Sequence, residues 1–286
     1  MPTPDPIKLA FSTNAYTRFP LVDAIRDIAA AGYSGVEILA DVPHAYPDAM
    51  DAALVKSVRA VLEETGLAVS NINCNCTFGY WKDAPPEPYF EPSLISPNAK
   101  HRADRARMIL KTLEFAREIG ARNISITSGR CLPGMPPDLA SKEFARNIRP
   151  ILDRAESLGI DIGIECEPGL YVEYVAELCE WIDKLGSKRF GANLDVGHSV
   201  VIGESISTVV SQLRGRIWNT HVEDLPGRKH YHMVPGEGTL DWQSLWGAIR
   251  ETRYDRFATV ELYTQTADPH GAARKSFDWL TRSISS

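Results

Sequence analysis

The amino-acid sequence predicts an α/β fold, a single (β/α)8 TIM barrel that spans residues 1–286. Short apolar segments alternate with amphipathic segments eight times without a break in composition, and eight is the number of units that closes such a barrel. Five connections end a helix at a glycine and begin a strand one to four residues later, as Gly66 and Gly120 do. The main alternative is an open, doubly wound sheet, and the absence of GxGxxG after the first strand disfavours it.

The expected elements follow the hydrophobic pattern along the chain. Strands that are buried on both faces read as short apolar runs, and we expect them at residues 7–11, 35–40, 68–74, 123–127, 160–165, 190–195, 217–221 and 257–262. Apolar residues at helical spacing predict helices at residues 20–32, 52–64, 100–119, 142–158, 172–185, 205–213, 240–251 and 271–284.

A long loop at residues 77–97 interrupts this regular alternation. Loops of this length inside a compact domain are usually functional. Its aromatic residues are Phe78, Tyr80, Trp81, Tyr89 and Phe90. We expect the loop to lie over the barrel mouth, where aromatic faces stack on a bound molecule and exclude water. The alternative is a hydrophobic contact between two copies of the chain.

Composition limits the classes of partner and the compartment. The net charge of −6 lacks the basic footprint of a nucleic-acid-binding protein. No run of about 18 apolar residues predicts a membrane span, and the N-terminus does not have the pattern of a secretory signal. The five cysteines are an odd number without disulfide-framework spacing, which favours a reducing cytoplasm. The spacing of Cys74 and Cys76 predicts a structural role.

Four predicted strand ends carry metal-binding side chains, which are Glu165, Asp195, His221 and Glu261. The carboxyl ends of barrel strands converge on one axis, so these groups should face each other. Three carboxylates and one imidazole suit one divalent metal ion, and without a cation they would repel each other. The alternative is a metal-free ionic cluster, for which Arg228, Lys229 and Arg130 are the cations nearest in sequence.

The pattern IGIE…NLDVGH…NTHVED…PGEGTLDW…VEL resembles the xylose isomerase-like barrel superfamily, in its sugar phosphate isomerase/epimerase branch. Its members include ketose 3-epimerases, hydroxypyruvate isomerases, inosose dehydratases and, more distantly, the endonuclease IV group. The resemblance covers nearly the whole chain and is specific in the second half. It implies that Glu165, Asp195, His221 and Glu261 are the metal ligands, and that His198 lies beside the metal and touches substrate.

Two departures from the family bear on the number and kind of metal ions. The endonuclease branch carries histidines at the ends of strands three and four, where this chain reads NINCNCTF and ITSGRC. It also places an Asp two residues before a ligand His, whereas here His230 precedes His232. We therefore expect one ion rather than three. Mn²⁺ is expected, with Mg²⁺ or Co²⁺ as alternatives, ahead of Zn²⁺, because most of the ligands are carboxylates.

The chemistry expected of this site is proton abstraction next to a carbonyl through an enediolate, with Glu165 and Glu261 as the acid and base. This is the reaction of a sugar isomerase or epimerase. A lyase or dehydratase acting on a keto-sugar, keto-glycoside or cyclic polyol begins with the same step. An endonuclease IV-like hydrolase and a non-catalytic subunit are further alternatives. The expected substrate is a small sugar or polyol, bound by a homo-oligomer (dimer or tetramer), with a hetero-complex also possible.

Six further residues are candidates for substrate binding, namely His198, Glu167, His232, Arg228, Glu37 and Trp81. Several of them have a second interpretation. Glu167 follows the fifth strand closely enough to replace Glu165 as a ligand, or to be a solvated loop residue. Glu37 points either into the barrel or at substrate, and His232 either binds substrate or structures its loop.

Overall fold

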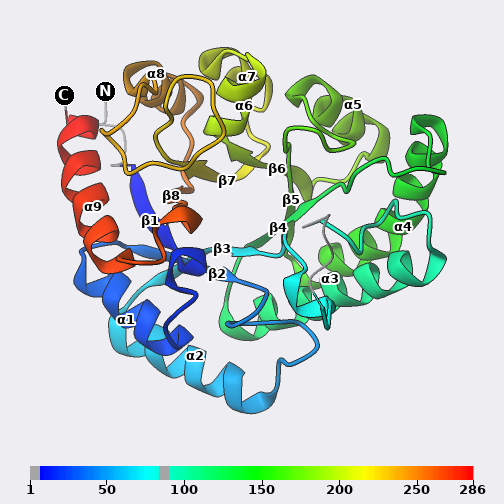
Figure 1. Ribbon diagram of the computed structural model, residues 1–286, viewed down its shortest axis with the longest axis horizontal. Helices are drawn as coiled ribbons and strands as arrows, with labels where there is room; N and C mark the ends of the chain where they lie inside the picture. The colour runs from blue at the N-terminus through cyan, green and yellow to red at the C-terminus, as the bar shows by residue number, and fades with distance from the viewer. Residues whose placement is uncertain (1–6, 84–89, 286) are drawn as a thin grey trace.

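A computed structural model describes residues 7–83 and 90–285 of the chain, and it shows a closed barrel of parallel strands. Each strand pairs with the next in sequence, and β1 also pairs with β8, which confirms the predicted (β/α)8 barrel (Figure 1). The strands are β1 (Lys8–Ser12), β2 (Gly35–Leu39), β3 (Ala68–Asn73), β4 (Asn123–Thr127), β5 (Asp161–Glu165), β6 (Phe190–Asp195), β7 (Ile217–Val222) and β8 (Phe257–Val260).

The helices form a ring around the barrel, and α9 lies next to α1 where the ring closes (Figure 1). They are α1 (Leu21–Ala30), α2 (Ala52–Thr65), α3 (Ala99–Ile119), α4 (Pro137–Leu158), α5 (Val175–Leu185), α6 (Val196–Ile202), α7 (Ile206–Gln212), α8 (Trp242–Thr252) and α9 (Pro269–Ser285). Within the described ranges, short 3-10 helices follow strands or loops, namely η1 (Thr13–Tyr16), η2 (Phe78–Tyr80) and η3 (Tyr263–Gln265).

The helix ends follow from local chemistry. Gly66 and Gly120 end α2 and α3 in the left-handed conformation, at φ 71° and 78°, which a residue with a Cβ adopts at a cost. At the start of α2, the side chain of Asp51 accepts a hydrogen bond of 2.7 Å from the backbone N–H of Leu54. These caps fix where the chain turns back toward the next strand.

The side chains of the barrel strands alternate between two environments. One set faces the helices, is fully buried and belongs to the apolar core, as Ile124 and Ile162 do. The other set faces the barrel axis and is largely polar. Asn71 illustrates this interior, because its side-chain N–H group donates to Glu37 on β2 and to Ser125 on β4. The hydrophobic core therefore lies between strands and helices, and the barrel interior is a hydrogen-bonded polar network.

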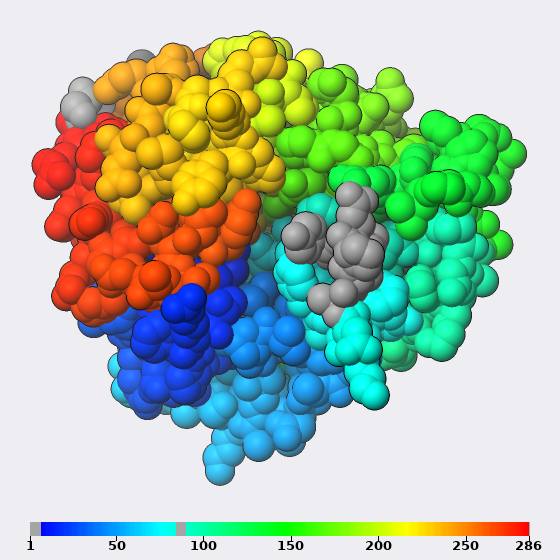
Figure 2. All heavy atoms as spheres, viewed as in Figure 1, coloured from blue at the N-terminus to red at the C-terminus, as the bar shows by residue number. Residues whose placement is uncertain are grey.

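The face shown in Figure 2 is hollowed near its centre. The segments that follow β7 (yellow) and β8 (orange) border this hollow, and they continue directly from the carboxyl ends of their strands. Over the described ranges, no helix is both long enough and apolar enough to cross a membrane. All five cysteines are free thiols, as the sequence led us to expect.

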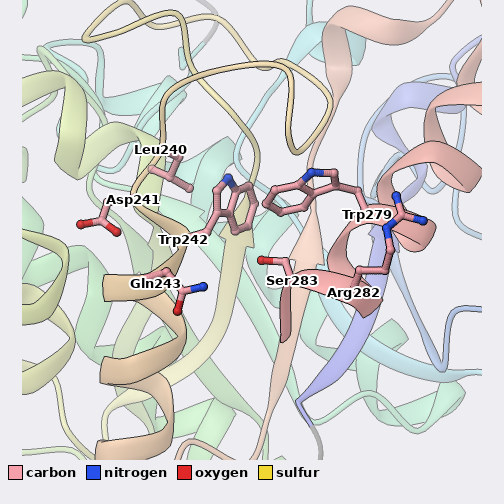
Figure 3. A pocket seen from close by; sticks show the side chains of 7 residues that line it. All are labelled: Leu240, Asp241, Trp242, Gln243, Trp279, Arg282 and Ser283. Atoms are coloured by element: carbon pink, nitrogen blue, oxygen red, sulfur yellow. The ribbon is translucent and has the colours of Figure 1, made fainter. Parts of the chain in front are cut away.

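A separate hollow of about 470 Å³ lies in the helical layer, between the start of α8 and the last part of α9 (Figure 3). The rings of Trp242 and Trp279 line it with their centroids 5.0 Å apart. Its other lining residues are Leu240, Asp241, Gln243, Arg282 and Ser283. None of these residues belongs to the carboxylate and histidine groups described below, so this hollow is not the candidate site.

Candidate metal centre and active site

The structure brings the four predicted metal ligands together at the carboxyl ends of β5 to β8. One potential ligand atom from each of Glu165, Asp195, His221 and Glu261 lies within 4.8 Å of the others, and all four residues are buried. The Nδ1 atom of His221 is 3.2 Å from a Glu165 oxygen, 3.6 Å from a Glu261 oxygen and 3.8 Å from Asp195 Oδ2. Glu261 directly follows β8 and still faces the axis.

His221 is oriented by Glu37, which lies deeper in the barrel. Glu37 Oε2 is 2.6 Å from His221 Nε2, so the opposite ring nitrogen, Nδ1, faces the carboxylates. Burial lowers the pKa of His221, but the charges of Glu261, Glu37 and Glu165 outweigh it and hold that pKa well above its ordinary value. A carboxylate behind a metal-binding imidazole fixes its tautomer and raises its basicity. Glu37 is fully buried and points into the barrel, which is one of the two orientations that the sequence allowed.

The carboxylates are held by side-chain amides, most of which come from the first half of the barrel. Glu165 Oε2 accepts a hydrogen bond of 2.8 Å from Asn75 and a very short one from Asn193 on β6. Glu261 Oε1 accepts hydrogen bonds of 2.9 Å from Asn14 and 3.0 Å from Asn73. The sequence analysis did not identify these amides. Their signal was the alternation of asparagine with other residues in NINCN, which places Asn71, Asn73 and Asn75 on one face of the strand and its continuation.

The charge balance of this cluster fits a divalent cation. Burial raises the pKa of Glu261 well above its ordinary value and nearby carboxylates add to the shift, although the charge of His221 opposes it. Asp195 Oδ1 accepts a 2.8 Å hydrogen bond from the backbone N–H of His198, while its buried Oδ2 accepts none from the described residues. Carboxylate oxygens that are buried, close together and short of donors are suited to coordinate a metal ion.

Glu223 is a further buried carboxylate that the sequence analysis did not single out. It is fully buried, and neither of its oxygens accepts a hydrogen bond from the described part of the chain. Burial, together with the charges of Asp195 and Glu261, raises its pKa well above the ordinary value. A Cβ atom at Gly197 would lie 1.7 Å from a Glu223 oxygen, so the glycine provides the space for this side chain.

A second group of side chains lies beside the first, nearer the mouth. It consists of His198, His230, His232 and Glu167. The Nε2 atom of His198 is 3.6 Å from Glu167 Oε2 and 3.6 Å from Asp195 Oδ2. Burial raises the pKa of Glu167 to about 7, opposed by the charge of His198. Glu165 therefore lies in the four-residue cluster and Glu167 in the neighbouring group. Of these four residues, His230 was not predicted to be part of the site.

Two predicted substrate-binding residues have their side chains engaged elsewhere. Arg228 donates from Nη2 and Nε to the backbone oxygen of Val201, at 3.0 and 3.3 Å, at the end of α6. Trp81 donates its indole N–H to the backbone oxygen of Glu91 at 2.7 Å, and its ring packs against His101 on α3. These contacts place Trp81 near the start of α3, so its predicted stacking on a sugar stays untested. Tyr89, also predicted to lie over the mouth, is outside the described residues.

A closed parallel barrel with carboxylates and imidazoles gathered at its strand ends has the architecture of a (β/α)8-barrel enzyme. The chain belongs to the xylose isomerase-like TIM barrel family, whose model matches residues 25–283. Its curated relatives include proteins named as sugar epimerases, isomerases and dehydratases. The predicted family is thereby confirmed, and the prediction of an enzyme of the sugar isomerase and epimerase class agrees with these names.

Individual comparisons are distant but nearly complete in length. The chain is 24% identical to fructoselysine 3-epimerase of Shigella flexneri over 276 residues, which is 95% of this chain and 96% of that protein. The structure of 3-keto-D-glucoside 4-epimerase YcjR from E. coli has a TM-score of 0.78 at 20% identity, covering 96% of this chain and 99% of that one. The IOLI protein, solved with a bound zinc atom, has a TM-score of 0.77 at 16% identity, covering 98% of each chain. At these identities the structural likeness shows the fold.

Proposed function

We propose that the chain is a divalent-metal-dependent sugar isomerase or epimerase that removes and returns a proton next to a carbonyl. The observation that carries this proposal is the convergence of Glu165, Asp195, His221 and Glu261 within 4.8 Å at the mouth of a closed barrel. The family of the chain and the names of its relatives support the same class of reaction. One divalent ion, with Mn²⁺ expected first, would be held by these four residues.

When bound, a divalent ion polarises a substrate carbonyl and its neighbouring hydroxyl and makes the hydrogen on the carbon between them acidic. Glu165 and Glu261 are the candidate acid and base, because each carries a carboxylate at the same depth from a different strand. Asn75 and Asn193 fix the orientation of Glu165, and Asn14 and Asn73 fix that of Glu261. Burial raises the pKa of Glu261, which makes it a stronger base than an ordinary carboxylate.

The proposed substrate is a small sugar or polyol with a carbonyl group. His198, His232 and Glu167 border the cluster and would contact its hydroxyl groups. A lyase or dehydratase reaction is the second candidate, because elimination beside a carbonyl begins with the same proton abstraction and relatives named as dehydratases support it. We further expect a homo-oligomer, either a dimer or a tetramer.

The decisive experiment follows hydrogen exchange in deuterated water by NMR. Free ketoses, inosose-like cyclic ketones and 3-keto-glycosides form the substrate panel. Glu165→Gln and Glu261→Gln each keep the size of the side chain and remove the base, so turnover should fall by about 10²-fold or more. Glu180→Gln, at an exposed position on α5, is the matched control.

The two variants also separate the candidate reactions. An epimerase with one base left can still exchange the substrate proton from one face, so proton exchange would continue while net conversion is lost. A lyase would lose both with one substitution. Turnover near the wild-type rate in both glutamine variants would contradict the proposed roles, and Glu167, His198 and His232 would become the candidate bases.

A further inference from the structure

A hollow of about 150 Å³ lies at the face of the barrel opposite the candidate metal centre. Its lining residues come mainly from the turns that lead into β4, β7 and β8. The amino ends of parallel barrel strands lie together on one face, and the catalytic mouth is on the other. The lining residues that decide the chemistry of this hollow are Arg122, Arg214, Trp218, Arg253, Asp255 and Arg256.

The charge around this hollow is opposite in sign to that of the whole chain. Four arginines line it together with one acidic residue, Asp255, whereas the chain carries a net charge of −6. Arg214 and Arg253 lie at the carboxyl ends of α7 and α8, and each helix end carries about half a unit of negative charge. Two such ends offset only about one arginine, so the hollow keeps an excess of positive charge.

Arg256 is held in a fixed position in this hollow. Its Nη2 atom donates to Asp161 on β5 at 2.8 Å, and its guanidinium carbon lies 5.3 Å from the centroid of the Trp218 ring. Asp161 also accepts a hydrogen bond of 2.9 Å from Arg189. One carboxylate is therefore shared between two guanidinium groups, which leaves part of their positive charge without a partner.

The other arginines are available to a ligand. The side chains of Arg122 and Arg253 are exposed, and neither makes a hydrogen bond or an ion pair with another of the described residues. Arg214 has one nearby carboxylate, that of Glu251, at 3.7 Å, and the Glu251 side chain is 79% exposed. An exposed ion pair of this length contributes little, so an incoming anion can replace it.

Arg253 also has an unusual backbone conformation. It caps α8 at φ 55°, in the left-handed region, where α2 and α3 have Gly66 and Gly120. A residue with a Cβ adopts this conformation at a cost, and such costs are often found at functional sites. The strained backbone indicates that the arginine side chain has a role that glycine would not fill.

We propose that this hollow binds one small oxyanion, a phosphate group, at the amino-terminal face of the barrel. Guanidinium groups bind phosphate oxygens through paired N–H donors, and a recess lined by charges of one sign concentrates ligands of the opposite sign. A volume of about 150 Å³ has room for several water molecules, which a phosphate group would replace. The rest of an organic phosphate would extend into solvent.

Calorimetry with inorganic phosphate tests this site on the full-length chain as purified. The titration is done in about 0.1 M KCl, which screens exposed charges that lie more than about 10 Å apart. We expect one phosphate per wild-type chain. The affinity should fall by about tenfold or more in Arg122→Gln and in Arg253→Gln, because each removes hydrogen bonds from a charged donor. Arg59→Gln, at an exposed position on α2, is the matched control and should keep the wild-type affinity.

A second titration compares glycerol 3-phosphate with glycerol. Equal affinities for glycerol 3-phosphate and inorganic phosphate would identify the phosphate group alone as the ligand, and binding that is tenfold tighter would identify an organic phosphate; both results support the site. Glycerol alone should not bind. Circular dichroism melting verifies that each variant folds, and phosphate should raise the melting temperature of the wild type more than that of Arg122→Gln.

Two results would overturn the proposal. One is the absence of saturable phosphate binding, or equal affinities in Arg122→Gln, Arg253→Gln and Arg59→Gln. The other comes from His221→Ala, which alters the candidate metal centre on the opposite face and should leave phosphate affinity unchanged. Loss of phosphate binding in this variant alone would place the anion at the catalytic mouth. The titrations need no sugar substrate, so failure of the proposed sugar reaction would leave them unaffected.

Discussion

The two halves of the barrel contribute different chemistry to the same place. Strands β5 to β8 end in the ionisable residues, one from each strand or the residue after it. The first half contributes neutral amide donors, which are Asn14, Asn73 and Asn75, and these reach the carboxylates from the opposite side of the axis. Two residues depart from this division. Glu37 comes from β2 and supports His221 from below, and Asn193 on β6 donates its amide to Glu165.

This difference shows that the first half is more than a scaffold. A carboxylate that accepts a hydrogen bond from an amide keeps its charge and gains a fixed orientation. An arginine or lysine in the same place would neutralise the carboxylate and compete with a metal ion. Amides therefore hold the ligand oxygens in place and leave their charge available, which is the property that a cation site requires.

The largest expected effect tests the charged half. His221→Ala or Asp195→Ala should lower the affinity for the divalent ion in the four-residue cluster by more than about 100-fold, because loss of a ligand exceeds the 10–100-fold effect of losing a supporting residue. The fold should be retained, since Ala leaves the helices and their apolar core intact. Elemental analysis and circular dichroism measure the two properties. Full metal content together with full activity in either variant would end the ligand assignment.

A smaller effect tests the amide half. Asn75→Ala removes the 2.8 Å hydrogen bond to Glu165, and we expect about a tenfold loss in affinity for the ion, at the lower end for a supporting residue. Asn147→Ala is the matched control, because its amide donates to the backbone oxygen of Leu94 outside the barrel interior. Zn²⁺ calorimetry compares the two variants. If both variants bind the ion with the same affinity, the hydrogen bond from Asn75 does not contribute to metal binding.

The fold was largely predictable because its signals are local. Apolar runs and helix-ending glycines located all eight strands and eight of the helices. The exceptions have physical causes: α4 begins at Pro137 instead of residue 142, because proline is well suited to the first turn of a helix. The short helix α6 was not predicted. Asp195 is both the last residue of β6 and the N-cap of α6, so no loop separates the strand from the helix.

The candidate site was predictable only where its residues are chemically distinctive. Carboxylates and a histidine at strand ends stand out in an apolar context, and the four proposed ligands were found in this way. Asparagine is common in loops and turns, so Asn73 and Asn75 gave a weak signal despite their spacing. Glu223 was missed because its burial depends on the space above Gly197, which only the three-dimensional structure reveals.

The smallest expected effect concerns Arg228, which the sequence suggested as a substrate contact. In the structure its guanidinium group packs across Gly203, where a Cβ atom would lie 2.6 Å from Nη2, and donates to the backbone oxygen of Val201. Arg228 therefore covers the end of α6 and does not reach into either half of the site. Arg228→Ala should change KM by about twofold at most, which is the usual effect of a surface substitution.

Steady-state kinetics on the substrate found in the exchange screen measure this change in KM. A tenfold rise in KM with kcat unchanged would show instead that the side chain turns toward the mouth when substrate binds, and it would add a cationic contact to a site otherwise built from carboxylates, amides and imidazoles.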